Sequence, residues 1–273
     1  MRRIEDKIAI ALLWMSSLIV LAFLFVLLGY ILIKGLPVLS PRFLFSFPHG
    51  VEARGGILPM IAATFYLTIL AGFIVSPIAI GGAVYLTQYA KPGRLVRMIR
   101  FGADALSSVP SIVFGLFGLA LFVSIFGYSM IAGGLTLSLM ILPVVMRASE
   151  DAILAVPRSF REASFGLGAS QWQTIKNVII PVALPRILTG LILGIGRAFG
   201  ETAAVFLTAG MAINLPFLPT EPGRTMTVHL YLLATEGISL DIAFGTALLL
   251  SIFILSFNFL ARYMGRRSVK GGR

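Results

Sequence analysis

The amino-acid sequence predicts an all-α integral membrane protein with six transmembrane helices and both termini in the cytoplasm. Its 273 residues are 58% hydrophobic and only 12% charged, whereas roughly a quarter of the residues are charged in an average soluble domain. The apolar residues gather in six long runs, and Lys and Arg are concentrated in alternate connecting segments. The absence of Cys excludes a disulfide-stabilised scaffold, a thiol enzyme and a Cys-ligated zinc site.

Each apolar run has about the length of a membrane crossing, since about 20 helical residues span the ~30 Å hydrocarbon core. The six expected spans are residues 8–33, 57–89, 103–126, 128–146, 178–209 and 242–263. The first is too long for a signal peptide and lacks a nearby cleavage site, so we expect an uncleaved anchor. The second and fifth exceed a straight crossing, and Pro77, Pro181 and Pro185 mark the expected bends.

The distribution of basic residues predicts the orientation of these spans. With the N-terminus inside, 16 of the 22 Lys and Arg residues fall in inner segments. The outer segments contain only Lys34, Arg42, Arg54 and Arg224. Because short cytoplasmic loops are enriched in Lys and Arg, this asymmetry places both termini inside. The net charge of +11 therefore favours contact with anionic lipid headgroups, and no nucleic-acid partner is expected.

The same pattern divides the chain into three parts. Residues 1–56 comprise the N-terminal segment, the first span and an external loop. Residues 57–264 form a core of five spans, in which an inner loop occupies about 147–177. Residues 265–273 form a short basic tail on the cytoplasmic side.

The inner loop contains the pattern of a short exposed helix. Ser159 is followed three residues later by Glu162, which is the spacing of a capping box and predicts a helix start at Ser159. Gly166 and Gly168 are suitable positions for its end. Such a helix could lie on the lipid headgroups, or it could insert into a groove on a partner protein. The pattern alone leaves both alternatives open.

Besides Arg186 near its inner end, the fifth apolar run contains two charged residues deep within it. Arg197 and Glu201 each cost about 2.5–3.5 kcal/mol to insert on translocon scales, so they require a reason to be there. Their spacing of four would place them on one helix face, where they could pair. One alternative is an ion pair that locks two helices together. The other is an anion site, because a guanidinium binds an oxyanion with two hydrogen bonds and keeps its charge.

Hydroxyl groups surround a proline in the third apolar run. Ser107, Ser108 and Ser111 flank Pro110, which breaks the helical hydrogen-bond pattern. These hydroxyls could satisfy the backbone groups that the break leaves free. They could instead line the pathway of an oxyanion, and Thr202 in the fifth run is a further candidate.

The inner loop resembles a known motif when its full spacing is considered. Glu162-Ala163-Ser164 is followed after three residues by Gly168, and nine residues later by Val-Ile-Ile-Pro181. This arrangement is similar to the EAA loop of ABC-importer permeases, with conservative departures at Ser164, Val178 and Ile180. In that family the loop is the coupling helix that docks into a separate ATPase subunit.

The likeness extends over nearly the whole chain. Four stretches carry it, namely residues 55–59, 107–115, 157–164 and 196–203. They resemble the PstA-type permeases of bacterial phosphate ABC importers, and 196–203, which reads Gly-Arg-Ala-Phe-Gly-Glu-Thr-Ala, is the most specific. The PstC-type sister family shares much of the pattern. The Glu-Thr-Ala-Ala continuation and the segment after the first span favour the PstA type.

The resemblance implies a type I ABC-importer permease in the bacterial inner membrane. The implied partners are a PstC-type sister permease, two PstB-type ATPase subunits and an external PstS-type phosphate-binding protein. This chain would bind no cofactor itself, because the partner subunits use the ATP. The residues assigned to the substrate pathway are Arg197, Glu201, Thr202, Ser107, Ser108 and Ser111. The residues assigned to the ATPase-coupling loop are Ser159, Arg161, Glu162, Ala163 and Gly168.

Other functions find less support in the sequence. No Lys belongs to a Gly-Lys-Ser/Thr phosphate loop, so we expect a transport subunit without its own ATPase and not an enzyme. His49 and His229 are isolated, so neither a metal site nor a catalytic set is predicted. The alternatives are an ion-coupled secondary transporter of an oxyanion, the PstC-type sister subunit, and a permease for molybdate or sulfate. A channel is disfavoured because nothing suggests a symmetric selectivity filter.

Overall fold

The computed structural model describes residues 2–49 and 54–270, with side chains described for 5–48 and 55–264. Within these residues, five helical stretches are long and apolar enough to cross a membrane: Glu5–Val38, Leu58–Tyr89, Met130–Leu154, Gln171–Phe199 and Leu240–Met264. A bent pair, Arg94–Ser107 with Ser111–Phe126, supplies the sixth apolar stretch. The predicted all-α membrane architecture is confirmed, and its orientation stays a prediction.

The helices follow one another with short connections. In chain order they are α1 (Arg2–Gly35), α2 (Pro41–Phe45), α3 (Leu58–Val84), α4 (Arg94–Ser107), α5 (Ser111–Gly118), α6 (Ser124–Phe126), α7 (Met130–Leu154), α8 (Arg158–Gly166), α9 (Gln171–Thr174), α10 (Ile180–Phe199), α11 (Ala203–Phe206), α12 (Met226–Thr235) and α13 (Leu240–Lys270). A 3-10 turn (Leu36–Val38) and π-helical turns (Tyr85–Tyr89, Leu119–Val123, Ile175–Ile179) extend four of them. The strands β1 (Pro48–His49) and β2 (Arg54–Gly55) form a small antiparallel hairpin in which Pro48 pairs with Gly55.

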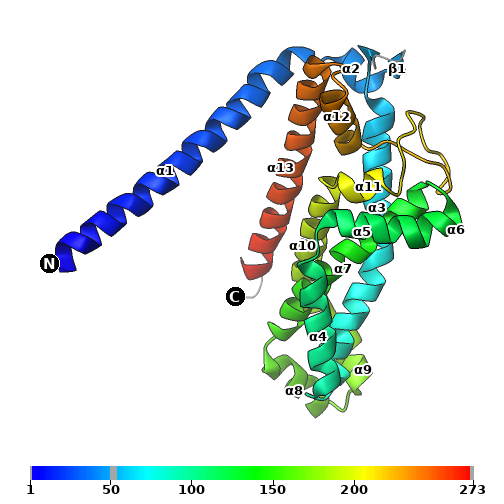
Figure 1. Ribbon diagram of the computed structural model, residues 1–273. Helices are drawn as coiled ribbons and strands as arrows, with labels where there is room; N and C mark the ends of the chain where they lie inside the picture. The colour runs from blue at the N-terminus through cyan, green and yellow to red at the C-terminus, as the bar shows by residue number, and fades with distance from the viewer. Residues whose placement is uncertain (1, 50–53, 271–273) are drawn as a thin grey trace.

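The core of the molecule lies where α3, α7 and α10 pack together (Figure 1). Small residues allow this close approach: a Cβ added to Gly190 would lie 2.3 Å from the Ala148 Cβ, and one added to Gly194 would lie 2.7 Å from Val145. The Ser138 hydroxyl is within 3.1 Å of the Ala71 carbonyl and links α7 to α3. A compact three-helix core therefore supports the peripheral elements.

Helix α1 projects away from this core (Figure 1). It meets α13 only near its C-terminal end, where the Tyr30 ring lies edge-on to Phe244 at 5.3 Å. Most of its remaining apolar side chains are exposed. In contrast, α8 and α9 lie at one end of the molecule, and α2, β1 and α12 lie near the opposite end (Figure 1).

The third predicted span, 103–126, begins earlier than predicted, at Arg94, and is broken near the predicted proline. A break after Ser107 separates α4 from α5, and the pair is bent by 102°. The physical reason is Pro110, which has no N–H to donate and disfavours a helical backbone at the residue before it.

The fourth and fifth predicted spans also have wrong ends. α7 continues past residue 146 to Leu154, because Arg147 and Glu150 form ion pairs with α4. The fifth span, 178–209, is interrupted after Phe199, and the one-turn helix α11 follows the break. At the C-terminus, α13 extends through the predicted basic tail to Lys270, and residues 271–273 of that tail lie outside the described residues.

Candidate functional site

Two helix breaks meet at the centre of the candidate site. The first lies before α5, at residues 108–110, and the second lies between α10 and α11, at residues 200–202. A Cβ added to Gly115 of α5 would lie 3.0 Å from the Ala204 Cα and 3.1 Å from the Ala203 carbonyl oxygen of α11. Only glycine permits this separation, so the sequence brings the two broken spans into contact.

Arg197 lies in the last turn of α10, and its side chain is exposed. The Gly200 N–H bonds to the Arg197 carbonyl at 3.2 Å, and the Glu201 N–H bonds to the Ala198 carbonyl at 3.1 Å. These tighter turns end the helix, so Glu201 lies beyond it and not one turn above Arg197. The predicted placement of both charges on one helix face is therefore wrong.

Glu201 is nevertheless the centre of a small polar group. Its carboxylate is half-buried, accepts a hydrogen bond from the Ser111 hydroxyl and is subject to the positive charge of Arg197. Ser111 is the first residue of α5, and negative charge is favoured at a helix N-terminus. The structure therefore brings together Arg197, Glu201 and Ser111 from two separate breaks.

The other two predicted serines are placed differently. The Ser107 hydroxyl donates to the Ala103 carbonyl at 2.8 Å, and the Ser108 hydroxyl is within 3.1 Å of the Asp104 carbonyl. A hydroxyl has one proton to donate, and here the last turn of α4 uses it. Both side chains are exposed, but they can offer an anion no free proton in this arrangement.

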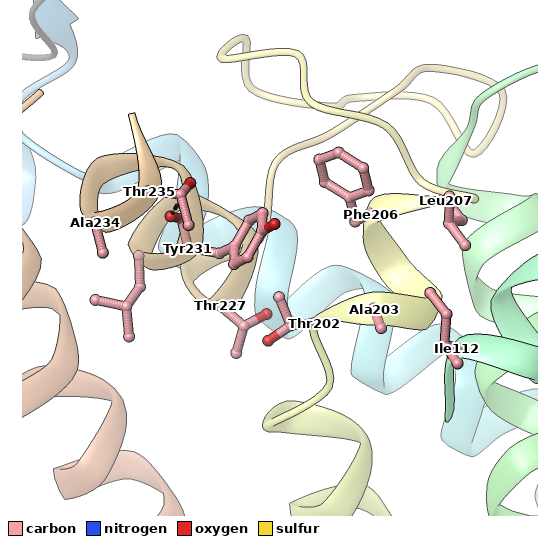
Figure 2. A pocket seen from close by; sticks show the side chains of 10 residues that line it. Ile112, Thr202, Ala203, Phe206, Leu207, Thr227, Tyr231, Ala234 and Thr235 are labelled. Carbon is pink, nitrogen blue, oxygen red and sulfur yellow. Dashed lines mark hydrogen bonds between the residues drawn. The ribbon is translucent and has the colours of Figure 1, made fainter. Parts of the chain in front are cut away.

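A cavity of about 600 Å³ opens beside the second break (Figure 2). Its lining comes from α5, α11, α12 and the break, and consists of Ile112, Thr202, Ala203, Phe206, Leu207, Thr227, Leu230, Tyr231, Ala234 and Thr235. Figure 2 shows Thr202 and Thr227 near each other, below Phe206 and Tyr231. None of the lining residues is charged, so the cavity itself contains hydroxyl groups but no counter-charge for an ion.

The contribution of α12 to this site was not predicted from the sequence. The Thr227 hydroxyl donates to the Glu201 carbonyl at 2.6 Å, and Thr227 is buried. The signal that could have found it is the polar pair Thr225 and Thr227 at the start of an otherwise apolar helix. His229 on the same helix is 1% exposed, and burial together with the positive charge of Arg224 lowers its pKa to about 4.

The second candidate site is the inner loop, which forms α8 as predicted. The expected N-cap at Ser159 is wrong: Pro157 occupies the N-cap position, and α8 begins at Arg158. Proline has a fixed backbone angle that favours a helix start directly after it. The capping box instead lies at Ser170 and Gln173, at the start of α9.

One face of α8 packs against the rest of the protein, and the other is exposed. Ser164 points inward, where its hydroxyl lies 2.8 Å from that of Thr174, and Arg161 donates to the Ile153 carbonyl at 3.4 Å. Ser159, Glu162 and Ala163 are exposed, as are the large apolar side chains of Phe160, Phe165 and Leu167. Gly168 has a φ of +83°, which favours glycine and ends the helix sharply. The exposed residues form one outer surface, called here the α8 outer surface.

Two ion pairs between α4 and α7 were also missed by the sequence analysis. Asp104 accepts three hydrogen bonds from Arg147, with Nη2 to Oδ2 at 2.6 Å. Arg100 Nη2 lies 3.1 Å from Glu150 Oε2, and the Glu150 side chain is only 3% exposed. Arg100 and Asp104 are four residues apart on α4, and Arg147 and Glu150 are three apart on α7, so each set of charges lies on one helix face. This spacing could have indicated the ion pairs from the sequence.

The sequence model of the family described as "Binding-protein-dependent transport system inner membrane component" matches residues 79–270. The chain is 39% identical to the probable ABC transporter permease protein YqgI of Bacillus subtilis, over 97% of this chain and 96% of YqgI. It is 33% identical to the phosphate transport system permease protein PstA of Haemophilus influenzae, over 96% of this chain and 94% of that protein.

A solved structure is similar over most of the fold. It is the bacterial alginate ABC transporter in complex with its alginate pentasaccharide-bound periplasmic protein. The TM-score is 0.69 at 15% identity, with 96% of this chain and 95% of that chain covered. This likeness confirms the predicted type I importer fold.

Proposed function

The chain belongs to the family of inner-membrane components of binding-protein-dependent transport systems, and we propose that it is the permease through which an ATP-driven importer moves inorganic phosphate. It is a multi-pass protein of the inner membrane. The observation that carries the choice of phosphate is the meeting of Arg197, Glu201 and Ser111 at two helix breaks. The PstA relative named as a phosphate permease supports the same choice.

On this proposal Arg197 supplies the counter-charge for phosphate inside the membrane. Its guanidinium can form two parallel hydrogen bonds with two phosphate oxygens, which fixes the orientation of the anion. Ser111 would then donate its proton to a third oxygen instead of to Glu201. Thr202 adds a hydroxyl on the cavity side, and Ser107 and Ser108 lie along the same break and would line the route toward α4.

Glu201 has a different role in this scheme. With no anion bound, its carboxylate keeps Ser111 oriented and balances Arg197. When phosphate arrives, the two negative charges repel, so Glu201 limits how long the anion stays. A pathway needs such weak binding, since an anion held too tightly would not move on.

The α8 outer surface is the proposed contact with the ATPase. Leu167 is 89% exposed and Phe160 is 47% exposed, which is costly in water unless a partner covers them. Ser159, Glu162 and Ala163 belong to this surface, Gly168 lies beside it, and the half-buried Arg161 flanks it. We assign two ATPase subunits as partners, which bind the ATP, so that this chain requires no cofactor of its own.

The remaining partners account for other exposed surfaces. The exposed apolar side chains of α1 fit contact with lipid and with a sister permease, which would complete the pathway. An external phosphate-binding protein would deliver its cargo to the outer segments, where Phe47 and Phe217 are exposed beside a smaller cavity of about 290 Å³. These assignments rest on the predicted orientation of the chain.

A competition experiment tests the substrate. The complete complex is reconstituted in vesicles that contain ATP, and uptake of labelled phosphate is measured with an excess of unlabelled phosphate, arsenate, sulfate or molybdate. We expect unlabelled phosphate and arsenate to suppress the signal, because both are tetrahedral anions that carry protons at neutral pH. Equal suppression by sulfate or molybdate would instead assign the chain to a different oxyanion.

A further inference from the structure

A buried hydroxyl chain connects α12 to the charged break. The Thr227 hydroxyl donates to the Glu201 carbonyl at 2.6 Å, and the Thr225 and Thr227 oxygens are 2.9 Å apart. Because the single Thr227 proton goes to the carbonyl, which can only accept, Thr225 must donate to Thr227. The Val228 N–H in the first turn of α12 completes the chain by donating to Thr225 at 3.5 Å.

The first turn of α12, where these hydrogen bonds begin, is also held in place. The Met226 N–H donates to the Thr64 hydroxyl oxygen at 2.9 Å, and Thr64 in turn donates to the Met60 carbonyl at 2.6 Å. Thr64, Thr225 and Thr227 are all at least 97% buried. The first turn of α12 is thereby fastened to α3, and through Thr227 it reaches the backbone of Glu201.

Few other hydrogen bonds are open to the Glu201 carbonyl. It lies after the end of α10 and before the single turn of α11, in residues without regular helical hydrogen bonding. A buried hydrogen bond at this position limits the rotation of the peptide that follows Glu201, and so limits where the Glu201 side chain and Arg197 can lie relative to each other.

We infer that Thr227 is a positioning residue, which holds the 200–202 break in the geometry that transport requires. This inference rests on the proposed function, since it gives Thr227 a part in phosphate movement through the same site. Thr227 lines the cavity, but it acts through its hydrogen bond to the Glu201 backbone. Helix α12 therefore connects the segment after residue 210 to the break that carries Glu201.

Matched variants separate the hydroxyl from the shape of the side chain. Thr227→Val keeps the shape and removes the hydroxyl, whereas Thr227→Ser keeps the hydroxyl. Thr246→Val is the control, because Thr246 is also a buried threonine but donates only to the Ile242 carbonyl of its own helix, α13, at 2.8 Å, and does not line the cavity. All are measured in the complete complex, as initial rates of ATP-dependent phosphate uptake over a range of phosphate concentrations.

We expect Thr227→Val to lower the maximal uptake rate about tenfold without a change in KM or in the amount of assembled complex, as the loss of one buried hydrogen bond predicts. Thr227→Ser and Thr246→Val should stay within about twofold of wild type on the same reasoning. Wild-type rates in Thr227→Val, or an equal loss in Thr227→Ser or Thr246→Val, would overturn the inference.

A second measurement does not depend on transport. Amide hydrogen exchange over residues 200–203 should rise about tenfold in Thr227→Val and stay unchanged in Thr246→Val, because only the former frees the break. Unchanged exchange in Thr227→Val would refute the positioning role even if phosphate proves not to be the substrate. If Thr227→Val does not assemble, Thr225→Val is measured in its place and is expected to raise amide exchange over residues 200–203. Unchanged exchange in Thr225→Val would also refute the positioning role. A wild-type complex that moves no phosphate would contradict the proposed function alone.

Discussion

Arg197 combines two properties that are rarely found together in a membrane protein. It lies in the last turn of a spanning helix, and its side chain is exposed and not paired directly with Glu201 among the described contacts. Inserting such a charge is costly, so its position points to a function. The proposed function is binding of the phosphate anion as it crosses.

Replacement of Arg197 tests this role against a matched control on the same helix. Arg197→Ala is expected to abolish ATP-dependent phosphate uptake while the complex still assembles, because no other charge in the site replaces the guanidinium. Arg186→Ala, which removes another exposed arginine from α10, should retain uptake. Uptake rates normalised to the amount of complex provide the measurement, and a normal rate in Arg197→Ala would exclude the anion site.

His229 provides a prediction on pH. Its pKa is about 4 in the folded protein, below the ordinary 6.5, because the buried ring resists protonation. Above about pH 6.5 both the folded and unfolded states are neutral at this residue, and stability is unaffected. Between about pH 6.5 and 4 the unfolded state binds the proton first, so stability falls as the pH falls, by up to about 1.4 kcal/mol per pH unit.

Thermal unfolding of the purified protein from pH 7 to pH 4 measures this effect. The fall in melting temperature should be smaller in His229→Gln than in wild type, since glutamine does not titrate in this range. Parallel curves for the two proteins would show that His229 is not protonated on unfolding.

Single residues also show where sequence reasoning succeeds and where it fails. Arg197, Glu201 and Ser111 could be chosen as candidates, because charges and hydroxyls in apolar runs are conspicuous. The difference between Ser111 and its neighbours Ser107 and Ser108 could not be predicted, since it depends on which acceptor each hydroxyl reaches. Thr227 was missed for the same reason, because its partner lies 26 residues away.

Among the helices, the two interruptions differ in how visible they are in the sequence. The break before α5 contains Pro110, so a kink there was expected, although its size was not. The break after α10 contains no proline and was invisible, because it depends on tertiary contacts such as the bond from Thr227 to the Glu201 carbonyl. Local sequence therefore predicts the presence of a helix more readily than its end, when a contact with a neighbouring helix determines that end.

Helix α8 supports a prediction on coupling. Glu162→Lys reverses a charge on the α8 outer surface, and we expect it to abolish phosphate-dependent ATP hydrolysis or the binding of the ATPase. Asp151→Lys makes the same charge change at an exposed position near the end of α7, where a cation is favoured, and should be tolerated. The ATPase activity and the subunit composition of the purified complex report both effects, and normal coupling in Glu162→Lys would remove the docking proposal.

The two ion pairs between α4 and α7 should contribute unequally. Glu150→Ala leaves Arg100 partly buried without its partner and should lower the free energy of unfolding by about 2 kcal/mol. Asp104→Ala breaks a more exposed pair and should cost less than about 1 kcal/mol. Melting temperatures of the two variants in detergent compare these values, and equal losses would contradict the assigned difference in burial.

For the whole molecule, the length and number of the apolar runs were sufficient to predict an all-α membrane fold. The packing of α3, α7 and α10 into one core was not predictable, because it depends on the matching of Gly190 and Gly194 with small residues of α7. Nor did hydropathy indicate that α1 would project away from the core (Figure 1), since an apolar helix can face lipid or pack against other helices equally well.

The energy source of transport tests the central claim most directly. Vesicles that carry the complete complex are supplied with labelled phosphate, with and without internal ATP, after the proton and sodium gradients have been collapsed. The account predicts uptake that requires ATP and continues without either gradient. Uptake that ignores ATP and disappears with a gradient would contradict it and would identify an ion-coupled secondary transporter.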